Sequence, residues 1–276
     1  MSKGLLDPKV DFVFKNIFGS PNHPEILISF LNATLKAKKK IVNVDIKKTD
    51  IEKQYIEDKY SRLDVKATTS NDEIINIEIQ LKNENNMVKR SLYYLSKMYE
   101  EQLNEKEDYS KLVRTVCINI LNFKYLKTDN FHTGYRFKEI ESNEELTDIM
   151  EVHFIEIPKL QDSSDEKDML VAWTEFLKDP ESEKVRGLEL SIEEIRQAKD
   201  ELIRMSNDST QRELYDMRAN SLRDKMSELN AAEKKGIEKG REEEKIKRAR
   251  NMKLNGLDTN TIAKVTNLSE DEIDKL

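Results

Sequence analysis

The chain has 276 residues, of which 37% are charged and 37% hydrophobic, and its formal net charge is −7. This length supports one sizeable domain, or a domain and a smaller module. The acidic balance argues against a generally basic protein that coats DNA, although a local basic groove is compatible with it. The single cysteine excludes an internal disulfide bond. Since no stretch approaches 18 uncharged apolar residues and the N-terminus has no apolar signal region, we expect a cytoplasmic protein without a membrane span.

Two helices are predicted near the N-terminus. Asp7, followed by proline, is typical of a helix start, and apolar residues recur at helical spacing over residues 10–18. Asp11 lies at the border of this apolar stripe, where it is either a neighbour of a polar site or an ordinary first-turn acid favoured by the helix dipole. Pro24 opens the second predicted helix. A strand is predicted over residues 41–46.

A two-stranded hairpin follows. Residues 62–67 and 74–81 each alternate apolar and polar side chains, which is the period of a half-buried strand, and a segment of turn composition joins them. In a strand, side chains two apart share a face. Asp64 therefore points away from the apolar face of the first strand. Glu78 and Gln80 point together from the polar face of the second.

Three polar side chains are therefore expected to converge: Asp64, Glu78 and Gln80. Two carboxylates on adjacent strands suit a hard divalent cation such as Mg²⁺ or Mn²⁺, whose bound waters can attack a phosphate. The alternation by itself favours the alternative, a solvated outer face of a hairpin, where acidic side chains are common. Lys59 and Arg62, just before and within the first strand, are candidate contacts for phosphate.

The next predicted helix covers residues 85–104. Its core-facing positions are predicted to be Val88, Leu92, Leu95 and Tyr99, and its basic, aromatic-flanked face to be Lys89, Arg90, Tyr93 and Lys97. Such a face could follow a nucleic-acid backbone by charge and ring stacking, or serve only as the rim of an amphipathic helix packed on the sheet. Arg90 is the strongest candidate phosphate contact, because a guanidinium group can bind phosphate through two hydrogen bonds.

Three further strands are predicted before the chain becomes helical. Residues 114–123 form a near-continuous apolar run, which is typical of a strand buried on both faces. Residues 135–140 alternate as a more exposed strand, and residues 150–157 form another. Helices and strands in this order predict an α/β domain with a mixed central sheet.

The chain is predicted to be largely helical after residue 165. The long charged helix at 211–235 has a sparse apolar stripe, which could pack on the first domain or pair with a second copy, so a homodimer stays open. Gly236–Gly240 is predicted to interrupt the helix as a hinge. We therefore predict three parts, which are residues 1–160, 161–235 and 236–276.

The last part is predicted to hold a helix-turn-helix-like pair. The two helices are expected at 259–265 and 270–276, and Ser269 with Glu272 is expected to form a capping box. The acidic residues of the final helix would repel phosphate. The basic helix at 242–254 is consequently the better candidate for DNA contact, and a tail for packing or oligomerisation is the alternative that this charge favours.

Several segments, in this order along the chain, resemble the PD-(D/E)XK nuclease superfamily and, within it, the recombination-promoting nuclease / putative transposase family. They are residues 7–19, 26–32, 63–67, 76–80 and 151–159. The resemblance implies a restriction-endonuclease-like α/β core, with a mixed central sheet flanked by helices, followed by a helical C-terminal region. It also implies a Mg²⁺-dependent DNA endonuclease linked to recombination or mobile elements.

The resemblance also implies roles for individual residues. Asp64 and Glu78 would hold the metal, with Asp11 as a further neighbour, while Gln80 stands where most members of the superfamily carry lysine. Gln80 has no charge to offer, but it could position the attacking water or donate a hydrogen bond to phosphate.

Two other functions stay open. In the first, the protein binds DNA but its nuclease site has been weakened by the glutamine at position 80. In the second, the helical C-terminal region oligomerises and the nuclease fold serves as a scaffold for protein interaction. A test for metal-dependent DNA cleavage distinguishes an active nuclease from the weakened one. A test for DNA binding at moderate salt distinguishes the interaction scaffold from both nuclease forms.

Overall fold

The computed structural model describes residues 4–36, 39–47, 65–165 and 167–276. They divide into two compact units, Met1–Arg218 and Ala219–Leu276. The helices are α1 (Asp11–Phe18), α2 (Pro24–Leu35), α3 (Met87–Glu100), α4 (Met169–Lys178), α5 (Glu183–Glu189), α6 (Glu193–Asn207), α7 (Ser209–Leu254), α8 (Thr259–Thr266) and α9 (Glu270–Asp274), with short 3₁₀ turns η3 (Tyr109–Lys111) and η4 (Ile157–Lys159).

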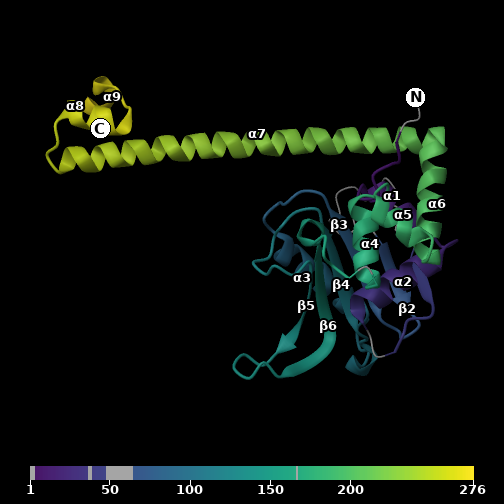
Figure 1. Ribbon diagram of the computed structural model, residues 1–276. Helices are drawn as coiled ribbons and strands as arrows, with labels where there is room; N and C mark the ends of the chain where they lie inside the picture. Colours follow the sequence, from purple (N-terminus) through teal and green to yellow (C-terminus); the bar gives the residue numbers. More distant parts are fainter. Residues whose placement is uncertain (1–3, 37–38, 48–64, 166) are drawn as a thin grey trace. The chain divides into compact units, whose positions relative to one another are not determined.

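The first unit is built on a six-stranded mixed sheet (Figure 1). Its strands are β1 (Val44–Lys47), β2 (Val65–Thr69), β3 (Ile74–Gln80), β4 (Thr115–Leu121), β5 (His132–Lys138) and β6 (Glu145–Glu156). They lie in the order β1-β2-β3-β4-β6-β5. The three central strands β3, β4 and β6 are parallel, whereas β1, β2 and β5 pair antiparallel with their neighbours. The predicted hairpin, the buried fourth strand and the mixed α/β sheet are confirmed.

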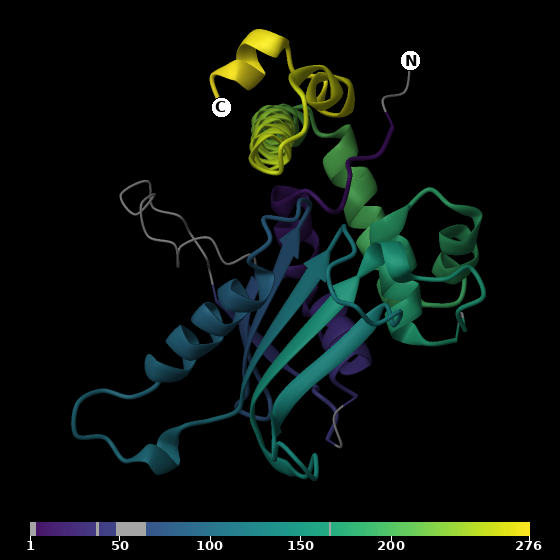
Figure 2. The same ribbon diagram turned by 90° about the vertical axis from the view of Figure 1, so that its left-hand side faces the viewer.

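Helices cover both faces of this sheet (Figure 2). On one face, alternate residues of β3 and β4 such as Ile77 and Ile118 join the main core, to which α1, α2, α4 and α6 contribute. On the other face, α3 packs over β4 and β6 around a smaller apolar cluster that includes Leu95 and Cys117. The site described below lies on this second face.

The predicted start of the first helix was wrong. Helix α1 begins at Asp11 with Val10 as its N-cap residue, and Asp7 instead accepts a hydrogen bond from the backbone N–H of Lys9, 2.9 Å away, in a turn before the helix. An Asp side chain can satisfy a turn as readily as a helix N-terminus, so this motif does not by itself fix the boundary. Helix α2 begins at Pro24, as predicted.

The predicted inner face of α3 was right at Leu95 and wrong at Val88 and Leu92. Val88 and Leu92 are exposed, and the buried residues are Met87, Ser91, Tyr94, Leu95 and Met98. The sheet beneath the helix carries buried polar side chains, which Ser91 can meet by hydrogen bonding and a leucine cannot. Tertiary contacts have overridden the apolar spacing of the sequence.

The predicted hinge at Gly236–Gly240 is helical. Helix α7 runs without a break from Ser209 to Leu254, although each glycine costs about 1 kcal/mol relative to alanine inside a helix. The flanking residues are mostly alanine, glutamate, lysine and arginine, which are good helix formers and outweigh two isolated glycines.

The second unit ends in a small helical module with its own core. Ala249, Ile262, Leu268 and Ile273 are buried together there. Ser269 and Glu272 form the predicted capping box at the start of α9. Lys253 of α7 donates to the carbonyl oxygens of Ile273 at 2.8 Å and Asp274 at 3.0 Å, which ties the end of α9 to the longer helix.

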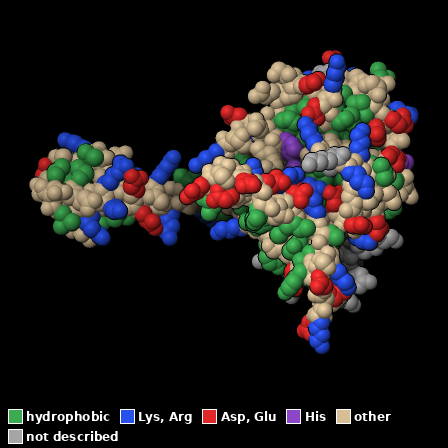
Figure 3. Space-filling model, turned by 90° about the horizontal axis from the view of Figure 1, so that it is seen from below, with side chains coloured by type: hydrophobic (Ala, Val, Ile, Leu, Met, Phe, Trp, Pro, Cys, Tyr) green, Lys and Arg blue, Asp and Glu red, His purple; other side chains and the backbone are tan. Residues whose placement is uncertain are grey.

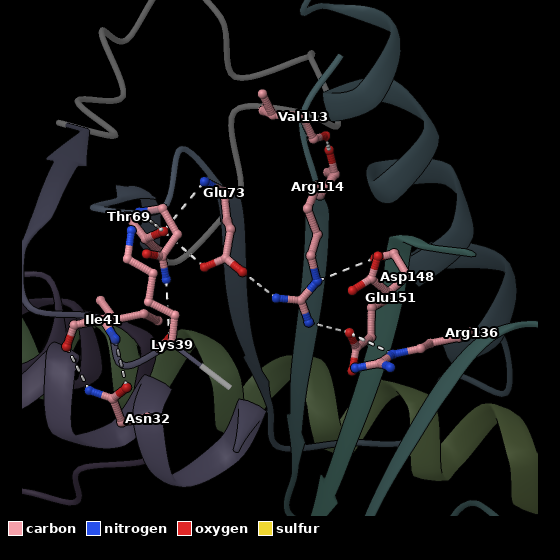
Figure 4. A network of polar contacts seen from close by, with 12 residues as sticks. Asn32, Lys39, Ile41, Thr69, Glu73, Val113, Arg114, Arg136, Asp148 and Glu151 are labelled. Carbon is pink, nitrogen blue, oxygen red and sulfur yellow. Dashed lines mark hydrogen bonds and ion pairs between the residues drawn. The ribbon is translucent and has the colours of Figure 1, made fainter. Parts of the chain in front are cut away.

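A chain of charged side chains crosses the strands of the sheet (Figure 4). Arg114, just before β4, forms ion pairs with Glu73, just before β3, and with Glu151 on β6. Glu151 also accepts from Arg136 of β5 at 3.0 Å and from His153 at 2.7 Å. Burial opposes ionisation of Glu151, but the hydrogen bonds from His153 and Arg114 outweigh it and hold its pKa at about 2. This network therefore joins four strands through two buried carboxylates, Glu73 and Glu151, with Arg114 between them.

We predict that Glu151→Gln lowers the free energy of unfolding at pH 7 by about 2–3 kcal/mol, because it removes one partner of a buried ion pair. Since the folded state depresses the pKa of Glu151, its contribution is present above pH 4.5 and is lost as the pH falls toward 2. The deficit of the variant should therefore narrow below pH 4.5. Urea denaturation at several pH values measures both effects.

Glu145→Gln is the matched control, because Glu145 pairs with the same Arg136 but its side chain is 43% exposed. An exposed pair contributes less than about 1 kcal/mol. Equal losses in the two variants would contradict the role given to Glu151.

Candidate functional site

Glu78 is a fully buried carboxylate near the carboxyl end of β3. Its strand neighbours Ile77 and Ile79 belong to the main core, so alternation turns Glu78 to the face covered by α3. In the parallel pairing of β3 and β4, its register partner is Asn119. In open α/β sheets, ligands bind beside the carboxyl ends of parallel strands, and Glu78 lies at such an end.

Helix α3 brings Arg90 against this carboxylate. The Nε–H of Arg90 donates to Oε2 of Glu78 over 3.0 Å, and the Asn76 amide donates to Oε1 over 3.4 Å. The guanidinium carbon of Arg90 lies 5.1 Å from the centre of the Tyr94 ring, within cation–π range. Arg90 is thus fixed on two sides, while 22% of its side chain is exposed.

Two opposing effects act on the protonation of Glu78. Burial raises its pKa, because a carboxylate loses hydration there, whereas Arg90, the Asn76 amide and the charge of Lys15 lower it. Burial is the largest of these effects. Glu78 therefore lies in a site where a second positive charge, brought by a metal, would be strongly stabilising.

A layer of buried polar side chains surrounds Glu78 beneath α3. Asn119 accepts from the Ser91 hydroxyl at 2.9 Å and donates to the carbonyl oxygen of His153 at 3.1 Å. Within the described residues, the buried Oδ1 of Asn76 has no hydrogen-bond partner. Burial raises the pKa of the Cys117 thiol, so this cysteine is an inert part of the layer and is no nucleophile.

The other predicted site residues have different surroundings. Gln80 lies on the same strand two residues after Glu78 and is partly exposed. Asp11 accepts from Arg218 of α7 at 3.1 Å, with both side chains more than two-fifths exposed. Lys59, Arg62 and Asp64 lie outside the described residues.

Two lysines near this site were missed by the sequence analysis. Lys15 of α1 is close enough to lower the pKa of Glu78. Lys66 of β2 pairs in register with Asn76, and burial lowers its pKa while Glu101, 3.8 Å away, opposes that shift. The hairpin alternation could have placed Lys66 on the polar face, whereas no local pattern connects Lys15 with β3.

A second missed cluster lies on the opposite face of the sheet. The antiparallel pairing of β5 with β6 brings the rings of His132 and His153 together, with Nε2 and Nδ1 2.9 Å apart. Burial and the neighbouring His153 lower the pKa of His132 to about 4, so it is neutral at pH 7. The other ring nitrogen of His153 contacts Glu151, which makes this pair an extension of the charged chain across the strands.

The fit of a divalent metal depends on more than the described residues. Among them, no group of three or more His, Cys, Asp and Glu side chains could hold a metal ion. Glu78 supplies a buried oxygen donor of the right chemistry, and Gln80 supplies an amide oxygen on the same strand face. Asp64, the second carboxylate predicted from the sequence, lies outside the described residues.

Comparison with protein families decides what this domain is. Residues 8–232 match the model described as PD-(D/E)XK nuclease family transposase. The chain belongs to this family. Residues 242–276 match the C-terminal HTH domain of the Rpn/YhgA-like nuclease family. The two matches bear out the resemblance found in the sequence and the restriction-endonuclease-like core. The second match covers the predicted helix-turn-helix-like pair.

Searches of curated proteins and of solved structures give no significant match. In the part of the chain that the structure describes, no helix combines the length and the apolar character needed to cross a bilayer.

We predict that Glu78→Gln, measured with chelator present, raises the free energy of unfolding at pH 7 by about 1 kcal/mol, because the neutral amide avoids burying a charge. A raised pKa in the folded state means that stability falls as the pH rises through that pKa. The advantage of the variant should therefore grow from pH 4.5 to pH 7. Urea denaturation of both proteins tests this, and a variant less stable than wild type at pH 7 would contradict it.

Proposed function

We propose that the protein is a Mg²⁺-dependent endonuclease that hydrolyses DNA phosphodiester bonds, with Mn²⁺ able to replace Mg²⁺. The observation that carries this proposal is the buried Glu78 at the carboxyl end of β3, held beside an arginine in a domain of the nuclease family. A fully buried carboxylate costs stability unless it is paired. Carboxylates whose pKa is perturbed by burial and by a specific charged partner are enriched at functional sites, and Glu78 has both features.

Asp64 is proposed as the second metal ligand. It directly precedes Val65, whose register partner on β3 is Ile77, and Ile77 directly precedes Glu78. Asp64 thus comes one residue before Val65 in the sequence, and Glu78 comes one residue after the register partner of Val65. A carboxylate pair on neighbouring strands is the donor set that the sequence predicts for a hard cation.

Roles follow for the residues of the chain. Glu78 and Asp64 would hold the metal, which when bound supplies a water of lowered pKa and shields the charge on phosphate. Gln80, partly exposed on the same strand, would orient that water or donate to a phosphate oxygen. Asp11 would join the site only after releasing Arg218, with which it is paired.

DNA contacts are proposed for a limited set of basic residues. Lys59 and Arg62 precede the acid of the hairpin, and Arg90 reaches Glu78 from α3. On the face shown in Figure 3, basic and acidic side chains intermingle over the described residues. The net charge of −7 also favours local phosphate contacts over a broad basic surface. A link to recombination or mobile elements, a cytoplasmic location and a homodimer stay predictions.

The proposal predicts that the purified protein nicks or linearises supercoiled plasmid with Mg²⁺ or Mn²⁺ and is inactive with chelator. Asp64→Asn and Glu78→Gln should each lose on the order of 100-fold or more of the rate, because each removes a ligand of the group that stabilises the transition state. Glu100→Gln is the control, since Glu100 is an exposed acid on α3 with a side chain 74% exposed.

The outcomes separate the candidate functions. Equal cleavage by the wild type, Asp64→Asn and Glu78→Gln would show that these two residues do not form the active site. Inactivity of a wild-type protein that still binds DNA would support the second candidate, a weakened nuclease that acts by binding. That candidate is favoured by Gln80, a neutral residue at the position where most of the superfamily carries lysine.

A further inference from the structure

We propose that Arg90 supplies, at the nuclease site, the positive charge that the motif lysine supplies in most PD-(D/E)XK nucleases. The inference rests on the proposed function and adds a catalytic residue to it. Within this chain, the lysine position of the motif is held by Gln80. A neutral amide can donate a hydrogen bond but cannot balance the charge of a phosphate.

The guanidinium group of Arg90 lies against the carboxylate of Glu78, the proposed metal ligand. Its contact with Glu78 is direct, at 3.0 Å, and uses Nε. The hydrogen bond from Arg90 to Glu78 uses Nε and not the two terminal amino groups of the guanidinium. The Arg90 side chain is 22% exposed. A guanidinium group can hold a carboxylate with one edge and a phosphate with another, because its five N–H donors point outward in one plane.

Arg90 is also held in place, as a residue that acts on a reacting group must be. The ring of Tyr94, one helical turn further along α3, lies against its guanidinium group. The carboxylate of Glu78 is fixed in turn by its place on a central strand of the sheet. This arrangement limits the loss of side-chain entropy when a phosphate is bound.

Other cations near the site fit the role less well. Lys66 is paired with Glu101 at 3.8 Å and lies opposite Asn76, two positions before Glu78. Lys15 acts on Glu78 through its charge, from α1. Lys89 is the neighbour of Arg90 but is exposed on the outer side of α3. Arg90, by contrast, donates a hydrogen bond directly to the Glu78 carboxylate.

The test combines loss of Arg90 with restoration of a lysine. We would prepare Arg90→Gln, Gln80→Lys, the double variant with both changes, and Lys138→Gln as a control with the same loss of charge at an exposed position of β5. Urea denaturation first verifies that each protein is folded. Plasmid cleavage with Mg²⁺ and binding of a short DNA duplex without divalent metal are then measured, the binding as a function of salt.

Arg90→Gln should lower the cleavage rate by about 100-fold, as expected when a group that stabilises transition-state charge is removed. The double variant should recover a substantial part of that loss, at least about 10-fold, because the Gln80→Lys change restores one positive charge beside the phosphate. Arg90→Gln should also weaken duplex binding and reduce the salt slope by about 1. Lys138→Gln should leave the cleavage rate within about 2-fold of wild type, because Lys138 is an exposed residue of β5.

If Arg90 has only a structural role, the rescue and DNA-binding experiments will give different results. If Arg90 only holds Glu78 in place, Gln80→Lys will not rescue Arg90→Gln, and duplex binding without metal will be unchanged. Either result overturns the proposal. Absence of cleavage by the wild-type protein would defeat the proposed function, whereas the effect of Arg90→Gln on duplex binding and its salt slope would still decide whether Arg90 contacts phosphate.

Discussion

The burial of one negative charge organises this domain. Glu78 lies on a central strand beneath a helix, where an unpaired carboxylate would cost several kcal/mol. The chain meets that cost with Arg90, which donates to the carboxylate from α3. The face of α3 that turns to the sheet is set accordingly, with Ser91 bonded to Asn119 and apolar Val88 and Leu92 left exposed.

The two faces of the sheet have different roles, since one packs the main core and the other carries the polar site. One face carries the main core, including Phe14, Phe18 and Trp173, which pack ring against ring. At its edge the charged chain through Arg114 and Glu151 joins neighbouring strands. The other face holds the polar layer around Glu78. A rigid sheet fastened on one face can hold a carboxylate in fixed geometry on the other, which is what metal binding requires.

Local sequence patterns predicted much of the fold and one half of the site. Alternation located β2, β3 and the face of Glu78, and the apolar run located β4. The contact between Glu78 and Arg90 was not predicted, because it depends on how α3 is rotated over the sheet, and the apolar spacing of α3 indicated the wrong rotation. The contact of His132 with His153 likewise depends on the register of β5 with β6. The predicted hinge failed because glycine weakens a helix by a small amount that its neighbours can offset.

We propose that Glu78 is a metal ligand and shares the ion with Asp64. A crystal of the protein soaked in Mn²⁺, with the metal located by its anomalous scattering, tests this most directly. We expect a single strong peak about 2.1 Å from carboxylate oxygens of both residues, and no peak at that place in a Glu78→Gln crystal. A well-ordered Glu78 that keeps its contact with Arg90 and has no metal peak beside it, at a Mn²⁺ concentration that supports DNA cleavage, would contradict the account.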